Sequence, residues 1–192
     1  MTTHMNSPLP ITAHVFFAEW KRVCAAHFNT LIPIWSDRRA FTHWMLNGPE
    51  SITGLIASKM GLRKYSGYFF VDNVIYAEED LIPGSPDGSV WLRRIRIALE
   101  HENYFSSGLY TELSHLLTTA CDLRVLIAYP PSEAELVREL KYLHSIVVET
   151  SRSPEIAATK GLLFIAGWPP TKDGVIEWWG YVYEQEDWRR FT

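Results

Sequence analysis

The spacing of hydrophobic residues changes along the chain, from a helical period to an alternating one. From Thr12, apolar residues recur every three or four positions on one broad face, which predicts a helix that ends at Pro33. Two further helical segments are expected, over residues 37–46 and from residue 49 to a C-terminal stop at Gly61. The first third of the chain is therefore predicted to be helical.

Beyond residue 67 the pattern is typical of β-strands. Residues 68–76 are rich in aromatic and β-branched side chains. In residues 91–102 the apolar Ile97 and Leu99 alternate with Glu100 and Glu102, so the two acids share one face. Further helices are expected over residues 109–121 and 132–149, and further strands over residues 123–129, 162–168 and 175–183. This order predicts an α/β fold with a mixed central β-sheet flanked by helices.

The chain is expected to form one domain over residues 1–192, with residues 1–10 as a loose N-terminal lead-in. Its 192 residues suffice for a sizeable core, and no repeat or linker divides them. Its net charge of −4 excludes a protein coated in positive charge, but not an enzyme that touches nucleic acid over a small footprint. Neither a membrane-spanning run nor a secretion signal is found in the sequence, which predicts a cytoplasmic protein with no membrane partner.

Three acids are candidates for chemistry because of their positions in the expected strands. Asp72 interrupts an apolar strand, where a carboxylate is costly unless something compensates its charge. If that strand pairs as a hairpin with the next one, Asp72 converges on Glu100 and Glu102. Converging carboxylates repel one another and are tolerated chiefly around a cation or a proton. Because all three offer oxygen ligands, a hard cation, Mg²⁺ or Mn²⁺, is expected.

These stretches resemble the restriction endonuclease-like, or PD-(D/E)XK, nuclease superfamily. Its pattern is an acid on one strand and acid-X-Lys on the next, followed by a helix and a further strand. Here residues 71–75 and 97–103 match the two strands, and the resemblance covers roughly residues 50–130. It implies a restriction endonuclease-like core and Mg²⁺-dependent hydrolysis of phosphodiester bonds, with DNA ahead of RNA as partner.

The resemblance also implies roles for individual residues. Asp72 and Glu100 would be direct metal ligands, and Glu102 would hold a second cation or act as the base. The family often adds an acid from the helix before the first strand, for which Glu50 is the nearest candidate as a metal ligand and Glu19 the other. Glu102 stands where the family usually has Lys, so a non-catalytic binding or assembly protein of the same fold is the main alternative. A hydrolase of small phosphate esters is the third possible function.

Other interpretations of the same residues remain open. Asp72 could be a buried acid paired with Arg94 or Arg96 on the neighbouring strand. His101 is expected to point to the opposite sheet face and to pack there, and the remaining histidines, His115 among them, show no metal-ligand spacing. The aromatic strand at residues 178–183 could stack nucleobases, but a core strand or the edge of a homodimer is favoured.

Overall fold

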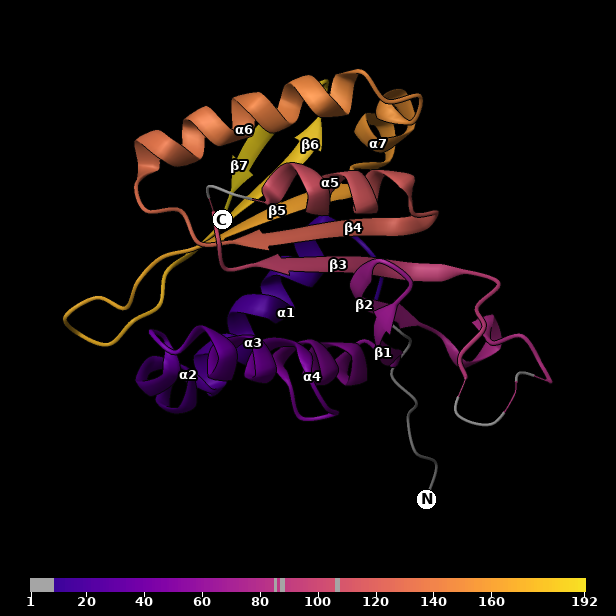
Figure 1. The fold of residues 1–192 in the computed structure, drawn as a ribbon, viewed down its shortest axis with the longest axis horizontal. Helices are drawn as coiled ribbons and strands as arrows, with labels where there is room; N and C mark the ends of the chain where they lie inside the picture. Colours follow the sequence, from indigo (N-terminus) through magenta and orange to yellow (C-terminus); the bar gives the residue numbers. More distant parts are fainter. Residues whose placement is uncertain (1–8, 85, 87–88, 106–107) are drawn as a thin grey trace.

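The computed structural model describes residues 9–84, 86, 89–105 and 108–192. They form a seven-stranded mixed sheet in the order β1-β2-β3-β4-β5-β6-β7, with helices on both faces (Figure 1). Strands β3, β4 and β5 are parallel to one another, and the remaining pairs are antiparallel. The strands are β1 Arg63–Tyr68, β2 Val71–Tyr76, β3 Ile95–Glu102, β4 Cys121–Ala128, β5 Leu162–Gly167, β6 Trp178–Glu184 and β7 Asp187–Phe191. The predicted mixed sheet flanked by helices is confirmed; of the predicted lead-in, residues 1–8 lie outside the described residues.

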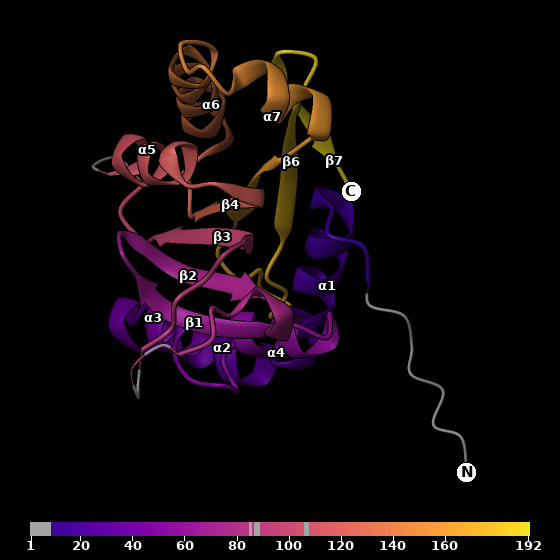
Figure 2. The ribbon, with the colours of Figure 1, turned by 90° about the vertical axis from the view of Figure 1, so that its right-hand side faces the viewer.

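The helices form two layers, one on each face of the sheet (Figure 2). The first layer holds α1 Ala13–Ala26, α2 Phe28–Ile34, α3 Arg38–Leu46 and α4 Ile52–Lys59; the second holds α5 Leu109–Thr118, α6 Glu133–Val148 and α7 Ser153–Thr159. Because side chains alternate along a strand, the sheet contributes to two cores. Ile97 and Leu99 pack under the first layer, and Ala98 and Leu126 pack under the second. Any chemistry on the Ala98 face of β3 is therefore covered by the second layer.

The first predicted helix divides into two. The chain leaves helical geometry at His27, whose N–H donates to the carbonyls of Val23 and Cys24, and then starts α2, so Pro33 lies inside this second helix and does not end the first. The helix predicted over residues 37–46 is confirmed as α3. The Asp37 side chain caps it by accepting from the Ala40 N–H at 3.0 Å.

Two hairpins were not predicted, for the same physical reason. The expected strand over residues 68–76 is the second arm of a hairpin that turns at Phe69 and Phe70, and Phe69 has a φ of 55°. The β6–β7 hairpin turns at Gln185 and Glu186, with φ values of 50° and 58°. Such turns normally carry Asn or Gly, because other side chains are strained at positive φ. Since neither turn has these residues, no turn signal marked β1 or β7 in the sequence.

The aromatic strand β6 lies inside the sheet, between β5 and β7. Its residues Tyr181, Val182 and Tyr183 are buried, so the prediction of a core strand is confirmed and the alternative of a dimer edge at this strand is wrong. In the ranges that the structure describes, no helix is both long and apolar enough to cross a bilayer.

A buried arginine fixes the end of α5 over the sheet. Arg124 on β4 is 2% exposed, and its guanidinium donates to the carbonyls of Leu116 and Thr119 at 3.0 and 2.9 Å. A third bond, of 3.4 Å, reaches the Cys121 carbonyl. The last carbonyls of a helix have no partner within the helix and carry partial negative charge, so a cation stabilises them. Arg124 therefore anchors the helix that begins near the exposed ends of β2 and β3.

We expect Arg124→Met to lower the free energy of unfolding by about 1–3 kcal/mol, because the carbonyls of Leu116 and Thr119 each lose a charged donor, although they still accept from the N–H of Thr119 and the guanidinium of Arg152. Chemical denaturation measures the change. Arg138→Met is the matched control, since Arg138 is 75% exposed and pairs with Glu135 on the same helix; its effect should stay within about 0.5 kcal/mol. Equal effects of the two substitutions would show that the carbonyl contacts do not stabilise α5.

Candidate metal centre

Asp72 and Glu100 lie directly opposite each other on the paired strands β2 and β3. The register pairs Asn73 with Leu99, and the next pair outward is Asp72 and Glu100, on the face that carries α5. Each carboxylate accepts a backbone N–H from the other strand: Asp72 N–H donates to Glu100 Oε2 at 3.1 Å, and His101 N–H donates to Asp72 Oδ2 at 2.9 Å. The two acids therefore share one spot on the sheet, as their positions in the sequence predicted.

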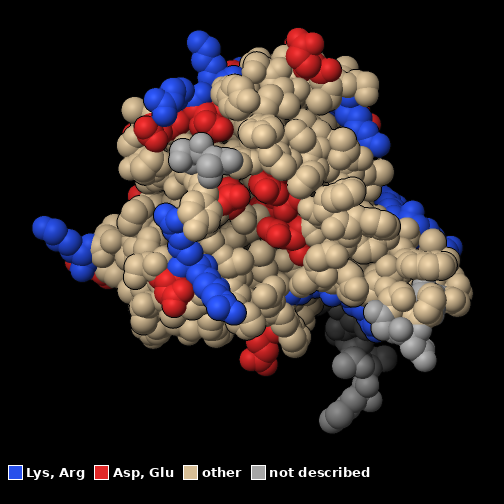
Figure 3. Space-filling view, viewed as in Figure 1, with Lys and Arg blue, Asp and Glu red and all other residues tan. Residues whose placement is uncertain are grey.

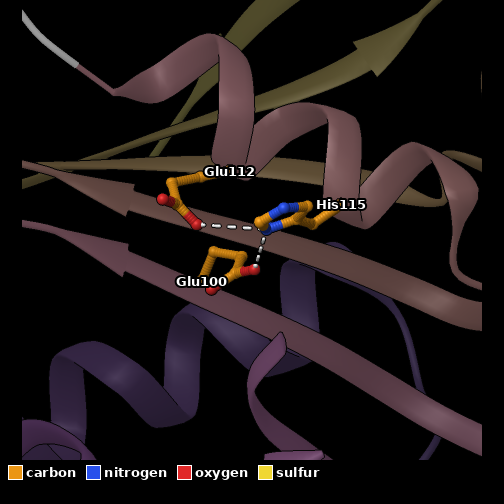
Figure 4. A group of neighbouring side chains, drawn as sticks. All are labelled: Glu100, Glu112 and His115. Atoms are coloured by element: carbon orange, nitrogen blue, oxygen red, sulfur yellow. Dashed lines mark hydrogen bonds and ion pairs between the residues drawn. The ribbon is translucent and has the colours of Figure 1, made fainter. Parts of the chain in front are cut away.

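Helix α5 brings two further polar side chains to the same place. His115 Nδ1 lies 3.2 Å from Glu100 Oε1 and 3.6 Å from Glu112 Oε2 (Figure 4). One ligand atom from each of Glu100, Glu112 and His115 lies within 4.8 Å of the others, so the three could hold one metal ion. The sequence prediction that His115 has no ligand spacing was wrong. Glu112 and His115 stand three positions apart, which places them on one helix face, and this spacing was the signal that could have revealed them.

The electrostatics of the group favour a bound cation or proton. Glu100 is 1% exposed, and burial together with the charges of Asp72 and Glu112 raises its pKa to about 9. Burial also raises the pKa of Asp72, although the N–H of His101 opposes this shift. The pKa of Glu112 is raised as well, first by burial and also by the charge of Asp72. Three carboxyl groups thus destabilise one another's charged form, and a cation would remove that repulsion.

Glu102 lies beside this group but is held by its own loop. Its Oε1 accepts the N–H of Tyr104, and its Oε2 lies so close to Gly108 that a Cβ there would approach it to 2.9 Å. Glu102 does not belong to the three-residue group, although its charge contributes to the raised pKa of Glu112. The expectation that Glu102 converges with Asp72 and Glu100 on a single ion is therefore not met, because the β3–α5 connection fixes its side chain.

The two helical acids proposed as additional ligands lie elsewhere. Glu50 is exposed in the turn before α4, a helix that packs on the opposite side of the sheet. Glu19 on α1 forms an ion pair with Arg22 at 2.5 Å. The structure therefore does not bring Glu50 together with Asp72 and Glu100; the acid that joins Glu100 is Glu112, from the helix after β3.

The two arginines considered as ion-pair partners of Asp72 bind other acids instead. Arg94 pairs with Asp122 at 2.8 Å, and Arg96 pairs with the buried Asp80 at 2.6 Å. Asp80 consequently has a lowered pKa, chiefly through its hydrogen bonds from Arg96. The alternative in which Arg94 or Arg96 neutralises Asp72 is therefore wrong.

His101 points to the opposite face of the sheet, as strand alternation predicted. Its Nε2 lies 2.7 Å from Tyr129 Oη, and its ring packs against Phe41 and Tyr129. Burial lowers its pKa to about 3, so it is neutral at physiological pH. His101 is a core residue, separated from the acids by the sheet.

Acidic side chains gather at the centre of the molecular face where β3 and α5 lie (Figure 3). Glu100 forms the buried floor of the group, whereas the side chains of Glu112 and His115 are 22% and 32% exposed. A ligand arriving from solvent would therefore meet Glu112 and His115 first.

We expect Glu100→Gln to make the metal-free protein more stable at alkaline pH, with little change at acidic pH. The folded-state pKa of about 9 exceeds the ordinary value of 4.5, so the folded state binds the additional proton between these values and loses stability as the pH rises. Denaturation with a chelator should show a gain that is small at about pH 4.5, grows as the pH rises, and exceeds about 1 kcal/mol at about pH 8.5. The matched control is Glu135→Gln on the exposed side of α6. A loss of stability at both pH values would identify Glu100 as a structural hydrogen-bond partner.

Compared with protein-family models and with curated proteins, the chain matches no family model and no curated sequence.

Proposed function

We propose that the protein is a metal-dependent nuclease that hydrolyses phosphodiester bonds at the Glu100–Glu112–His115 group. The observation that carries the proposal is the buried carboxylate of Glu100, which faces a second carboxylate and an imidazole within 4.8 Å and lies opposite Asp72. Such an arrangement is costly without a cation and matches the ligands that a divalent metal requires. Groups of this kind, with raised pKa values at a partly open site, are typical of functional sites.

The donor set favours Mn²⁺ over Mg²⁺. Carboxylate oxygens suit both ions, but an imidazole nitrogen is a better ligand for a transition metal than for Mg²⁺. Glu100 and Glu112 would supply the negative charge, and His115 Nδ1 would complete the protein's contribution. Asp72 would stay hydrogen-bonded to the His101 N–H and accept further bonds from metal-bound water. Such an ion supplies Lewis-acid activation of a phosphate oxygen and of an attacking water.

The chain's own side chains fit the remaining tasks of such a hydrolysis. Glu112 lies on the solvent side of the group and is 22% exposed, so with one carboxylate oxygen on the ion its other oxygen could accept a proton from an attacking water. Glu100 is too buried to meet substrate and acts as a fixed ligand. In the nuclease superfamily that the sequence resembles, a Lys stands where this chain has Glu102. Here the attacking water would therefore be oriented by carboxylates instead.

The order of elements supports the same proposal. The acids lie on the adjacent strands β2 and β3, and α5 and β4 follow, which is the order of the resembling nuclease pattern. The alternative is a non-catalytic binding or assembly protein of this fold. It is favoured by one observation: Glu102 is hydrogen-bonded to the following loop and does not offer a free group at the position of the usual Lys.

Hydrolysis of a small activated diester, bis(p-nitrophenyl) phosphate, and of labelled DNA and RNA tests the proposal directly. With Mn²⁺ the wild type should be active, and Glu100→Gln and His115→Ala should each lower kcat/KM at least about tenfold through loss of the ion. The control Glu135→Gln should leave the rate unchanged. Binding of Mn²⁺ without hydrolysis of any of these substrates would favour the binding-protein alternative, and the absence of Mn²⁺ binding would contradict the site. Hydrolysis of only the small ester would identify a small-ester hydrolase instead.

Glu102→Lys separates a one-metal from a two-metal site. Because Glu102 lies outside the group around Glu100, this variant should still bind one Mn²⁺ in calorimetry. A retained or higher rate would mean that the site works with one ion when Lys, the usual residue of the nuclease superfamily, stands at this position. Loss of activity together with loss of a second bound ion would assign that ion to Glu102.

A further inference from the structure

Exposed aromatic side chains lie on the chain segments that build the proposed metal centre. Phe69 and Phe70, at the tip of the β1–β2 hairpin, are 80% and 77% exposed. Tyr104, which follows β3, is 57% exposed, and Tyr110, in the first turn of α5, is 54% exposed. Burying large aromatic rings is strongly favourable, so a concentration of uncovered rings at one place indicates a binding surface.

These rings are tied to the acids by their positions in the chain. Phe70 stands two residues before Asp72 and Tyr104 stands two after Glu102, whereas Tyr110, two before Glu112 on α5, projects from a different side of that helix. In addition, the ring of Phe70 stacks on the ring of His115, with centroids 5.8 Å apart and planes 30° apart. The aromatic residues therefore belong to the segments that build the centre, and at least Phe70 lies directly on it.

The hairpin tip adopts a costly conformation for its sequence. Phe69 has a φ of 55°, in the left-handed region where a side chain is strained and where a turn of this kind normally carries Asn or Gly. A Gly at this place would remove the strain and the exposed ring together. Backbone strain held at a site is typical of residues retained for function.

Positive charge lies next to the aromatic residues. The guanidinium of Arg38 sits 4.2 Å from the centre of the Tyr104 ring. Arg38 and Tyr104 also line a groove of about 820 Å³ together with Asp37, Arg39, His43 and Asn103. Guanidinium groups bind phosphate through paired hydrogen bonds, so the two arginines could hold phosphates of a polyanion beside Tyr104, on the α3 side of the sheet.

We infer that the substrate is a single-stranded nucleic acid, whose bases stack on Phe69, Phe70 and Tyr104 while phosphates beside Tyr104 meet Arg38 and Arg39. The inference rests on the proposed function and deepens it. In a duplex the flat faces of the bases are covered by their neighbours, so exposed rings gain nothing from it; an unpaired strand offers its base faces to every ring.

The test compares binding of a labelled oligothymidylate of about twelve nucleotides with binding of a duplex of equal length, by fluorescence anisotropy with Ca²⁺ in place of Mn²⁺ to prevent hydrolysis. The wild type should bind the single strand at least about tenfold more tightly, as stacking on one or two rings provides. Phe69→Gly should lower the affinity for the single strand about fivefold or more, while leaving Mn²⁺ affinity unchanged and the melting temperature unchanged or higher. Phe70→Ser should also weaken single-strand binding.

Tyr142→Ser is the matched control, because Tyr142 is 50% exposed on α6, and it should bind like the wild type. Equal affinity of the wild type for single strand and duplex, or wild-type affinity in Phe69→Gly, would overturn the inference. Light scattering that shows a dimer for the wild type and a monomer for Phe69→Gly would also overturn the inference, since the hairpin tip would then contact a second copy. Failure of the nuclease proposal gives a different result: no hydrolysis of the small diester and no Mn²⁺ binding by the wild type.

Discussion

Glu100 presents a carboxylate that the fold has removed from water and placed next to other acids. Its strand is central, its side chain is 1% exposed, and it receives one backbone N–H from Asp72. One such hydrogen bond does not replace the hydration that an ionised carboxylate loses on burial, which is why its pKa rises to about 9. Without metal the group is neutral at physiological pH and contributes a proton to the site. With a divalent cation it could ionise, so metal binding and proton release would be coupled.

The surrounding structure holds this side chain in a fixed position. The antiparallel register of β2 and β3 sets Asp72 opposite Glu100, and two cross-strand hydrogen bonds link the pair. The buried Arg124 ties the end of α5 to β4, so that Glu112 and His115 approach from above the sheet. Rigid elements on both sides are what a ligand set needs, because a metal ion tolerates little error in ligand positions.

Much of this arrangement could be predicted from the sequence, since it depends on local patterns. The alternation around Ile97 and Leu99 identified β3 and placed Glu100 on the face opposite the first core, and the apolar surroundings of Asp72 marked it as costly. The contribution of α5 was missed because the spacing of His115 was compared only with that of the other histidines, and Glu112, three positions before it on the helix after the acid-bearing strand, was not considered. Glu102 was misplaced because alternation fixes only the side of the sheet, whereas the N–H of Tyr104 fixes where the carboxylate points.

The turn at Phe69 and Phe70 escaped prediction because two aromatic residues favour a strand by every local preference. The chain nevertheless reverses there, at the cost of a positive φ and two exposed rings. Sequence and structure disagree at the hairpin next to the proposed centre, and such local conflicts are expected where function constrains the chain more strongly than stability does.

Anomalous diffraction from crystals soaked in Mn²⁺ tests the central claim most directly. The account predicts a manganese peak at about 2.0–2.3 Å from a carboxylate oxygen of Glu100, a carboxylate oxygen of Glu112 and Nδ1 of His115. A soaked crystal with no peak at this group, and with His115 still hydrogen-bonded to Glu100, would contradict it.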